Sequence, residues 1–421
     1  MKPAWRTAAC LATLLLAACG PQEPIRIGFI GELTGNSADL GEAGRNGAML
    51  AIEQANQSGG INGRPIELLA RDTGSTPATA INSAKELLDA RVVAVIGTMT
   101  SGMTSALLPV HQAAQVVLLS PTATATKLSG VDDQLFRINW TTRDNAQLYA
   151  RYCLERGYRR LAAAANENNR VFSESWVKEL KLAFEKGGGE IVDTQYFESG
   201  ADSHLPVVEK LLQSQPDALL FVANAGDSAR LAQQTRKLDK KVPLIAAEWA
   251  STDQLLELGG NSVDGMAVVQ QFNADDPSPH FTDFRQRYVK RFGREPAFGS
   301  VLAHDAASVL IDSLTRRSND LPLKKALIEL GPFQGLQEKI HFDAYGDTQR
   351  SAAIAIRPIS IASEISGILL PSPPSFSISR WPVRNHTAPA PRNSVVLNRL
   401  WLIRWYMPPM KPSTIDRKSV V

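Results

Sequence analysis

Polar turns that directly follow apolar runs carry the side chains best suited to binding a small charged molecule. Residues 98–102 follow the apolar run 92–97 and precede a stretch with helical spacing. Backbone amides at a helix N-terminus, together with the hydroxyl group of Ser101, suit an anion such as a carboxylate, and we expect Thr100 beside them to contribute to the same site. The same residues would also serve as a simple N-cap of that helix, and the sequence leaves both interpretations open.

Two further polar positions have a comparable place at the ends of apolar runs. Residues 120–126, which include Thr122 and Thr124, follow the next apolar run along the chain. Glu248 follows the apolar residues 244–246, where its carboxylate would be placed to meet an ammonium group. Taken alone, Glu248 can equally be a surface acid.

The sequence lacks the motifs of the common catalytic classes. It has no Gly-x-x-x-x-Gly-Lys-Ser/Thr phosphate loop, no His-Glu-x-x-His and no Gly-x-Ser-x-Gly. Gly28 and Gly31 lie within the first apolar run and Gly35 follows it, but their spacing differs from that of a dinucleotide-binding fingerprint. The six histidines are scattered and form no ligand pair. We therefore predict a binding protein rather than an enzyme, with no cofactor and no metal ion.

The first twenty residues have the pattern of an export signal. Lys2 and Arg6 precede an apolar stretch of roughly a dozen residues that ends in small side chains. This stretch is too short to span a bilayer of about 30 Å. Its end, Leu-Ala-Ala followed by Cys19, resembles the lipobox of bacterial lipoproteins. We predict a signal peptide over residues 1–18 and a lipidated linker over 19–24; an ordinary signal peptide with a chance cysteine is the alternative.

The remaining cysteines do not support a disulfide framework. Cys10 would leave with the signal and Cys19 would carry the lipid, so that Cys153 stays alone. Since no later stretch reaches 18 unbroken apolar residues, we predict that the lipid is the chain's contact with the membrane.

The net charge of the whole chain is misleading, because the basic excess lies at the C-terminal end. The chain has 45 basic and 42 acidic residues, a net charge of +3. Residues 357–421 hold nine Lys and Arg against two Asp and Glu, which leaves 36 basic and 40 acidic residues elsewhere. The body of the protein is therefore mildly acidic, and nucleic-acid binding loses its electrostatic basis.

The same C-terminal residues differ from the body in composition. They contain ten of the 25 prolines and three of the seven tryptophans, and their proline runs interrupt both helical and strand periodicity. We predict that residues 357–421 are disordered, or are the out-of-frame product of a shifted reading frame. A Trp-rich interaction tail is the functional alternative.

The body alternates short apolar runs with amphipathic stretches. The expected strands are 25–31, 65–70, 92–97, 116–120, 160–165, 190–192, 218–222 and 244–246. The expected helices are 46–57, 78–90, 104–114, 145–156, 173–186, 205–213 and 228–238. Such alternation predicts an α/β fold with parallel sheets covered by helices on both faces. Because the length of the body exceeds what one core usually supports, we predict two lobes, with ligands bound at the carboxyl ends of the strands.

Several short motifs of the body occur in the order and spacing of a known family. They are the residues from Gly28 to Gly35, Asn46-Gly47-Ala48, the Asn-x-x-Gly-Gly-Ile-x-Gly run at 56–63, Asp72, 95–97 with Ser101, Ser120-Pro121 and His304-Asp305-Ala306-Ala307. Together they resemble the leucine/isoleucine/valine-binding family, the type I periplasmic binding proteins that supply ABC importers. The resemblance implies two Rossmann-like lobes joined by a multi-strand hinge, with 25–142 and 271–356 in lobe 1 and 143–270 in lobe 2.

The resemblance also implies how a ligand would be held. In that family a serine hydroxyl holds the α-carboxylate of the ligand, and this position corresponds to Ser101. A backbone group and a threonine on the next turn assist, which corresponds to Thr122 and Thr124. An acid of the second lobe, corresponding to Glu248, holds the ammonium group. A zwitterion needs donors and an anionic acceptor on opposite sides, and charge-assisted bonds from both lobes favour a closed form.

The sequence departs from the family pattern at the side-chain pocket. Phe172 and Asn224 stand where tyrosine is common, and Trp249 stands where a small residue is usual. Leu40 is expected on the first-lobe wall. A bulky Trp249 would reshape the pocket or stack against an aromatic or amide ligand, although lobe packing is an equal alternative for Phe172 and Trp249. The ligand's side chain is therefore left open.

Together these features predict an extracytoplasmic, lipid-anchored solute-binding component of an ABC importer. It would capture an amino acid or similar small zwitterion between two lobes by hinge closure, and deliver it to an ABC permease in the inner membrane. The expected location is the periplasm or cell envelope. The alternatives are a ligand sensor of the same fold, a binder of a carboxylate, aromatic acid or amide, and a hydrolase.

Overall fold

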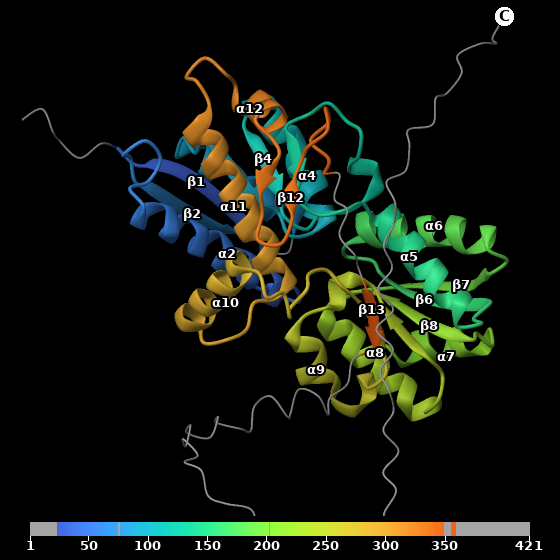
Figure 1. Ribbon diagram of the computed structural model, residues 1–421. Helices are drawn as coiled ribbons and strands as arrows, with labels where there is room; N and C mark the ends of the chain where they lie inside the picture. The colour runs from blue at the N-terminus through green and yellow to red at the C-terminus, as the bar shows by residue number, and fades with distance from the viewer. Residues whose placement is uncertain (1–22, 75, 202, 349–354, 359–421) are drawn as a thin grey trace, which may run out of the picture. The chain divides into compact units, whose positions relative to one another are not determined.

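The computed structural model of the protein describes residues 23–348, apart from residues 75 and 202, and residues 355–358. These residues form two α/β lobes within one compact unit of the chain (Figure 1). The predicted signal peptide, Cys19 and the predicted tail from residue 359 onward lie outside the described residues.

Five parallel strands form the sheet of the first lobe, in the order β2-β1-β3-β4-β5. The strands are β1 (Ile25–Gly31), β2 (Ile66–Asp72), β3 (Ala94–Gly97), β4 (Val117–Ser120) and β5 (Leu135–Arg137). The helices of this lobe are α2 (Ala38–Gln57), α3 (Pro77–Asp89), α4 (Ser101–Ala114), α10 (Pro279–Phe292), α11 (Phe298–Arg316) and α12 (Leu323–Glu329), with the short helix η1 (Thr126–Leu128) and the hairpin β11 (Phe333–Gln334) and β12 (Lys339–Ile340).

Both faces of this sheet are buried, as expected for a parallel sheet. Successive side chains of β1 alternate between them: Ile27 and Phe29 join the core beneath α2 and α11, whereas Ile30 joins the core beneath α3 and α4. Gly47 allows α2 and α11 to pack closely, because a Cβ atom there would lie 2.0 Å from the carbonyl oxygen of Ser300.

The second lobe has a six-stranded sheet in the order β13-β10-β9-β8-β6-β7. Its strands are β6 (Arg160–Asn166), β7 (Glu190–Phe197), β8 (Ala218–Val222), β9 (Leu244–Ala246), β10 (Ala267–Gln270) and β13 (Ala355–Pro358). Its helices are α5 (Thr142–Glu155), α6 (Arg170–Lys186), α7 (Leu205–Gln213), α8 (Ala225–Leu238) and α9 (Asp253–Gly259), with the short helices η2 (Glu248–Ala250) and η3 (Gly260–Val263). These elements confirm the predicted α/β fold with two lobes.

Strand β13 changes the expected assignment of the end of the body. It runs antiparallel to β10 in the second sheet, whereas the sequence analysis assigned residues 355–356 to the first lobe and residue 357 onward to a disordered tail. The pairing joins residues almost ninety positions apart, so local periodicity carries no sign of it. The other predicted lobe boundaries stay predictions.

Three segments of the chain connect the two lobes, and side chains tie them together. One segment joins β5 to α5, the second follows β10, and the third precedes β13. Asn139 of the first segment donates through Nδ2 to Gln271 Oε1 of the second (2.8 Å). Thr348, in the third, donates to the carbonyl oxygens of Ile138 (3.1 Å) and Asn139 (3.2 Å). This is the multi-strand hinge that the sequence predicts.

Several of the motif residues that carry the family resemblance have structural roles. Asn56 Nδ2 donates to the carbonyl oxygen of Ile66, and Asn56 Oδ1 accepts from the Ile66 amide, both at 2.8 Å, which joins α2 to β2. Asp72 Oδ1 accepts from the backbone amide of Leu33 (2.9 Å). Burial lowers the pKa of His304 to about 4, so its ring is neutral at pH 7.

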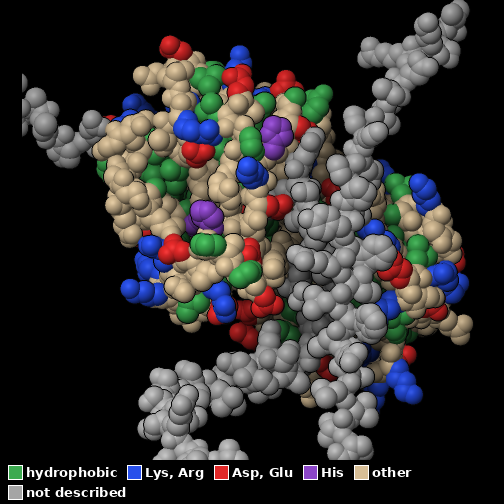
Figure 2. Space-filling model, viewed as in Figure 1, with side chains coloured by type: hydrophobic (Ala, Val, Ile, Leu, Met, Phe, Trp, Pro, Cys, Tyr) green, Lys and Arg blue, Asp and Glu red, His purple; other side chains and the backbone are tan. Residues whose placement is uncertain are grey.

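The visible surface carries charged side chains of both signs. On the face shown in Figure 2, Lys and Arg side chains are intermixed with Asp and Glu over both lobes. In the part of the chain that the structure describes, no helix is both long enough and apolar enough to cross a membrane.

Candidate ligand site between the lobes

The polar loops at the carboxyl ends of both sheets meet at a cleft between the lobes. In each sheet the cleft adjoins the place where the strand order reverses, between β1 and β3 and between β6 and β8, which is where open α/β sheets bind ligands. The cleft is lined by Leu40, Met99, Thr100, Ser101, Thr122 and Phe298 of the first lobe, by Asn139 of the hinge, and by Asn169, Phe172, Glu248 and Trp249 of the second lobe.

Ser101 is placed to donate a hydrogen bond into the cleft. It is the first residue of α4 and is 2% exposed. Its Oγ atom accepts hydrogen bonds from the backbone amides of Thr124 (3.1 Å) and Ala125 (3.2 Å). Because these two bonds use the lone pairs of the oxygen, the hydroxyl hydrogen remains to be donated. A donor of this kind at a helix N-terminus suits a carboxylate.

A buried acid lies behind Thr100 on the first-lobe wall. Glu32 directly follows β1, and its Oε1 atom accepts a hydrogen bond from Thr100 Oγ1 (2.5 Å). Its Oε2 atom has no hydrogen-bond partner among the described residues. Burial raises the pKa of Glu32, and the bond from Thr100 opposes that rise. Since the Thr100 hydroxyl donates to Glu32, its oxygen is left to accept a hydrogen bond rather than to donate one.

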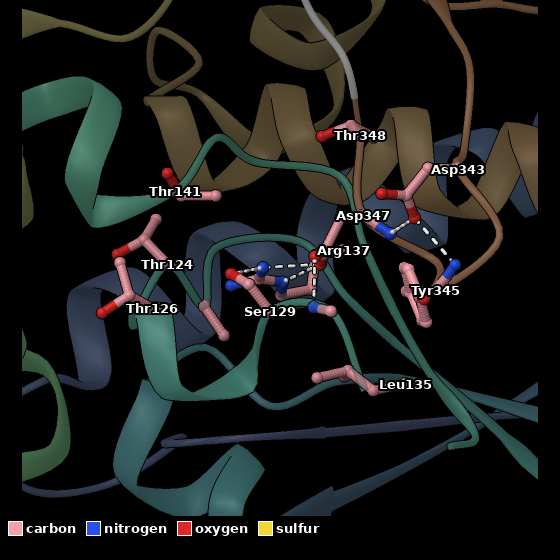
Figure 3. Close-up of polar contacts among 12 residues, drawn as sticks. Thr124, Thr126, Ser129, Leu135, Arg137, Thr141, Asp343, Tyr345, Asp347 and Thr348 are labelled. Atoms are coloured by element: carbon pink, nitrogen blue, oxygen red, sulfur yellow. Dashed lines mark hydrogen bonds and ion pairs between the residues drawn. The ribbon is translucent and has the colours of Figure 1, made fainter. Parts of the chain in front are cut away.

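Arg137 on β5 supports the turn that contains Thr124 (Figure 3). Its side chain is buried, and its Nη1 atom donates to the carbonyl oxygen of Ala125 (3.1 Å). Its Nε atom donates to Asp347 Oδ1 (2.9 Å), and Nη2 donates to the same carboxylate and to Ser129 Oγ. This ion pair connects the turn to the C-terminal segment of the first lobe. It therefore holds in place the backbone amides of Thr124 and Ala125, which donate to Ser101 Oγ.

Glu248 presents a buried carboxylate on the second-lobe side. It lies in η2, directly after β9, and is 3% exposed. Oε1 accepts from Asn145 Nδ2 and Oε2 from Trp176 Nε1, both at 2.9 Å. Burial raises the pKa of Glu248, and the hydrogen bonds from Trp176 and Asn145 oppose the rise. Because both donors are neutral, a cationic group in the cleft would supply the counter-charge for this carboxylate.

Aromatic side chains form the apolar part of the second-lobe wall. Phe172 and Trp249 pack edge to face, with ring centroids 5.6 Å apart and an interplanar angle of 82°. The Nε1 atom of Trp249 is buried and has no hydrogen-bond partner among the described residues. The pair thus packs the lobe and lines the cleft, and its contact with a ligand stays a prediction.

Hydrogen bonds connect the two lobes around the cleft. They join Gly102 N to Asn169 Oδ1 (2.9 Å), Thr126 N to Ser175 Oγ (3.0 Å) and Thr252 Oγ1 to Asp39 Oδ2 (2.6 Å). The cavity between the lining side chains has a volume of about 20 Å³, which is room for about one water molecule. The structure therefore represents a closed cleft, and a molecule the size of an amino acid can enter only if the lobes or the lining side chains separate.

A larger open groove lies elsewhere, between α5 and α6. Its volume is about 710 Å³, and its charged lining residues include Arg143 and Glu179, which pair with each other at 3.1 Å. Arg143 is exposed to solvent and Glu179, although buried, already has this partner, so the pair offers little to a specific ligand. The cleft, where buried polar groups of both lobes converge, is therefore the candidate ligand site.

The structure brings together seven of the nine residues that the sequence analysis assigned to ligand binding: Leu40, Thr100, Ser101, Thr122, Phe172, Glu248 and Trp249. The other two do not line the cavity. Thr124 contributes its amide to Ser101, and its Oγ1 atom accepts from Thr142 (3.0 Å). Asn224 caps α8, with its Oδ1 atom accepting from the Asp227 amide (2.8 Å). The roles of all nine in binding stay predictions.

The structure also adds residues that the sequence analysis missed. Asn169 follows β6 in a polar turn, so the signal that selected residues 98–102 was present there as well. Glu32 has the same kind of position after β1. Asn145 and Trp176 lie on helices whose periodicity marks them only as buried positions, so nothing local connects them with Glu248.

The buried thiol of Cys153 lies outside the cleft. Burial raises the pKa of the Cys153 thiol to about 12, which keeps it protonated and unreactive at pH 7. Among the residues that the structure describes, no three or more His, Cys, Asp or Glu side chains are grouped to hold a metal ion.

Comparisons with known proteins agree with this architecture. Residues 24–357 match a family described as periplasmic binding protein. The leucine-, isoleucine-, valine-, threonine- and alanine-binding protein of Pseudomonas aeruginosa is 22% identical over 330 residues, which cover 77% of this chain and 87% of the relative.

Solved structures share the fold at low sequence identity. A leucine-binding protein of Thermotoga maritima superposes with a TM-score of 0.74 at 22% identity and covers 80% of this chain and 96% of its own. A solute-binding protein of an R. palustris ABC transporter, solved with benzoate, has a TM-score of 0.72 at 18% identity and covers 80% of this chain and 94% of its own.

Proposed function

The chain belongs to the periplasmic binding protein family, and from this premise we propose that it is the solute-binding component of an ABC importer. Its ligand is an amino acid or a similar small zwitterion, bound in the cleft and delivered to a permease in the inner membrane. The family consists of binding proteins rather than enzymes, in agreement with the prediction from the sequence.

The observation that carries this proposal is the placement of Ser101 and Glu248 on one cavity from opposite lobes. The serine offers a hydroxyl hydrogen at a helix N-terminus, which suits an α-carboxylate. The glutamate offers a buried carboxylate held by neutral donors only, which suits an α-ammonium group. A zwitterion satisfies both at once and so favours the closed form of the cleft.

Hinge closure is part of the proposal. The cavity in the closed form is smaller than an amino acid, so binding begins from a form in which the lobes are further apart. The three connecting segments are the natural hinge, because they are few and their described residues carry no helix or sheet layer across the gap. Bonds from one ligand to both lobes would then stabilise closure.

An aromatic carboxylate is the second candidate ligand. The edge-to-face pair of Phe172 and Trp249 gives the cleft an aromatic wall, and the R. palustris neighbour binds benzoate. Such a ligand would use Ser101 but leave Glu248 without a cationic partner. The cost of a buried unpaired carboxylate makes this the less favourable of the two.

A thermal-shift screen of the twenty L-amino acids, benzoate and a set of sugars tests the proposal. A ligand at 100 times its Kd should add about 2.7 kcal/mol to the free energy of unfolding. Glu248→Gln should weaken the best amino acid by about 30-fold or more, because a charge-assisted bond is lost. Glu167→Gln, a partly exposed acid of the same lobe that pairs with Arg170, is the control and should bind normally.

Two results would contradict the proposal. One is stabilisation only by ligands without an amine. The other is an affinity of the Glu248→Gln variant that stays within a few-fold of the parent. A ligand that binds with no permease genes beside the coding sequence would point to a sensor of the same fold rather than to an importer component.

We also propose that the protein is exported and anchored by a lipid on Cys19. The support is the basic start, the apolar stretch and the Leu-Ala-Ala-Cys sequence of residues 16–19. The Cys19→Ala variant should move from the membrane fraction to the soluble fraction of the cell envelope. A parent protein that is already soluble would refute the anchor and leave the ligand proposal unaffected.

A further inference from the structure

Asn169 has an unusual position for an asparagine that precedes a helix. It is the N-cap residue of α6, where an asparagine side chain normally accepts a hydrogen bond from the helix's own first turn. Here its side chain makes no such bond. Its backbone is held in place instead, because the Asn169 amide donates to Asn166 Oδ1 (2.8 Å). The side chain is therefore free to point away from its own helix.

The side-chain oxygen of Asn169 reaches the other lobe. Oδ1 accepts a hydrogen bond from the backbone amide of Gly102, in the first turn of α4 (2.9 Å). Gly102 suits this approach, since a Cβ atom there would lie only 3.1 Å from the same oxygen. This bond connects the N-terminal turn of α4, which carries Ser101, directly to the N-terminus of α6.

The other end of the amide is available to a ligand. Asn169 is 6% exposed and lines the cleft, and within the described residues its Nδ2 atom makes no hydrogen bond. An amide whose oxygen is fixed has little freedom in where its NH₂ group points, and that group can only donate. The helices α4 and α6 both begin beside this group, and helix N-termini favour negative charge.

We propose that Asn169 is a specificity-determining residue that holds the ligand's carboxylate from the second lobe. Its Oδ1 atom ties the closed cleft to α4, and its Nδ2 atom donates to the carboxylate that Ser101 binds from the first lobe. The carboxylate is thus contacted by both lobes. This inference rests on the proposed function in one respect, that the ligand carries a carboxylate.

The substitution Asn169→Asp separates this role from a merely structural one. An aspartate keeps an acceptor for the Gly102 amide, so the contact between the lobes is retained. It loses the NH₂ donor and places a second negative charge beside the ligand's carboxylate. A neutral α-carboxamide ligand meets no such repulsion, and its own NH₂ group can donate to the new aspartate.

The matched control is Asn168→Asp, one residue earlier in the same turn. Asn168 Oδ1 accepts from the Ser199 amide (2.6 Å), and an aspartate can accept in the same way. Asn168 is exposed and does not line the cleft. It therefore adds the same charge to the same turn without touching the ligand.

The experiment measures binding by calorimetry with the full-length protein. The probes are the L-amino acid that binds the parent most tightly among the twenty, and the α-carboxamide of that amino acid. We expect Asn169→Asp to weaken the amino acid by about 10- to 100-fold. The carboxamide should bind this variant at least as well as it binds the parent, so that the preference reverses. Asn168→Asp should change neither affinity by more than about threefold.

The possible results separate the inference from the proposed function. If Asn169→Asp binds the amino acid as the parent does, or weakens both probes equally, the inference is wrong while the proposed function stands. If the parent binds benzoate but no amino acid, the proposed function is wrong. The pair benzoate and benzamide then replaces the two probes, and a reversed preference in Asn169→Asp still supports the inference. If the parent binds neither amino acids nor benzoate, both are wrong.

Discussion

Two asparagines of the second lobe occupy the same place in neighbouring strand–helix units but use their side chains differently. Asn224 follows β8 and caps its own helix, α8, by accepting from the Asp227 amide. Asn169 follows β6 and leaves α6 without a side-chain cap, bonding instead to Gly102 in the other lobe. The residue type and the place before the helix are the same, but the backbone differs: Asn224 is extended (φ −66°, ψ 170°), as a capping residue usually is, whereas Asn169 has φ −114° and ψ 47°. The two side chains therefore differ in backbone setting as well as in the partner that lies opposite.

Threonines and serines at helix starts divide in a similar way. Thr76, Thr141 and Ser278 accept hydrogen bonds from the first turns of α3, α5 and α10. Thr100 and Thr252 precede α4 and α9, but their hydroxyls donate to Glu32 and Asp39. Ser37 before α2 also makes no cap bond.

A helix cap contributes about 1 kcal/mol to stability. Thr100, Asn169 and Thr252 make no cap bond. Their side chains bond instead to groups in the cleft wall or in the opposite lobe. We infer that these three residues serve the cleft, whereas Thr76, Thr141, Asn224 and Ser278 serve the stability of their own helices.

Among the variants that test this comparison of N-cap residues, Asn224→Ala is expected to have the largest effect on stability. The variant loses the cap of α8 and also the bond from Asn224 Nδ2 to Asp227 Oδ2 (2.8 Å), both of them buried. We expect the free energy of unfolding to fall by about 2 kcal/mol, with the affinity for the ligand unchanged. Asn169→Ala should show the opposite balance, with a smaller loss of stability and a clear loss of affinity. Chemical denaturation and calorimetry of both variants would measure this, and equal losses of stability would undo the distinction.

A smaller effect, with a defined pH dependence, is expected for Thr100→Val. This variant removes the hydrogen bond to the buried Glu32 carboxylate and should lower stability by about 1.5 kcal/mol at pH 8. Burial already raises the pKa of Glu32 above its usual 4.5, and loss of the Thr100 bond raises it further. The Thr100 hydroxyl stabilises the ionised form of Glu32 and contributes less once Glu32 is protonated. The variant should therefore be destabilised fully at a pH well above the pKa of Glu32, and less as the pH falls through that pKa.

Thr76→Val is the control for this pH dependence. Thr76 accepts from the backbone amide of Thr79 (3.2 Å), and neither group titrates. Its loss of stability, about 1 kcal/mol, should be the same at pH 8 and pH 5. If denaturation curves show a pH-independent loss for Thr100→Val as well, then Thr100 does not act through Glu32.

Most of the fold follows from the sequence, because parallel strands and amphipathic helices have strong periodic signals. The predicted ranges 205–213 and 218–222 coincide with α7 and β8. Helix α2 begins at Ala38, eight residues before the predicted start, because Gly41 and Gly44 weaken the helical signal of its first turns. Strand β13 could not be predicted, since only its distant partner β10 defines it.

The site was predictable to the extent that it depends on strand ends. Ser101 and Glu248 follow apolar strands, and the structure brings them to one cavity. The family resemblance led to Asn224, which does not line the cavity, and not to Asn169, which does. Both are polar residues between a strand and a helix, and they differ in backbone conformation and in the contact of Asn169 with Gly102, which sequence periodicity does not show. Likewise Glu32 follows β1 like any loop residue, and its burial behind Thr100 is a property of the assembled lobe.

The smallest expected effect concerns Thr252, whose hydroxyl donates to Asp39 Oδ2 across the cleft (2.6 Å). Thr252→Val breaks this bond between the lobes but removes no helix cap, because Thr252 does not cap α9. The bond exists only when the lobes are together, so its loss favours the open form. We expect about threefold weaker ligand binding and little change in stability. Thr76→Val, an equivalent change at a threonine that does cap its helix, should lower stability and leave affinity intact. If calorimetry and denaturation give the two variants the same profile, the division between caps at the cleft and caps elsewhere does not hold.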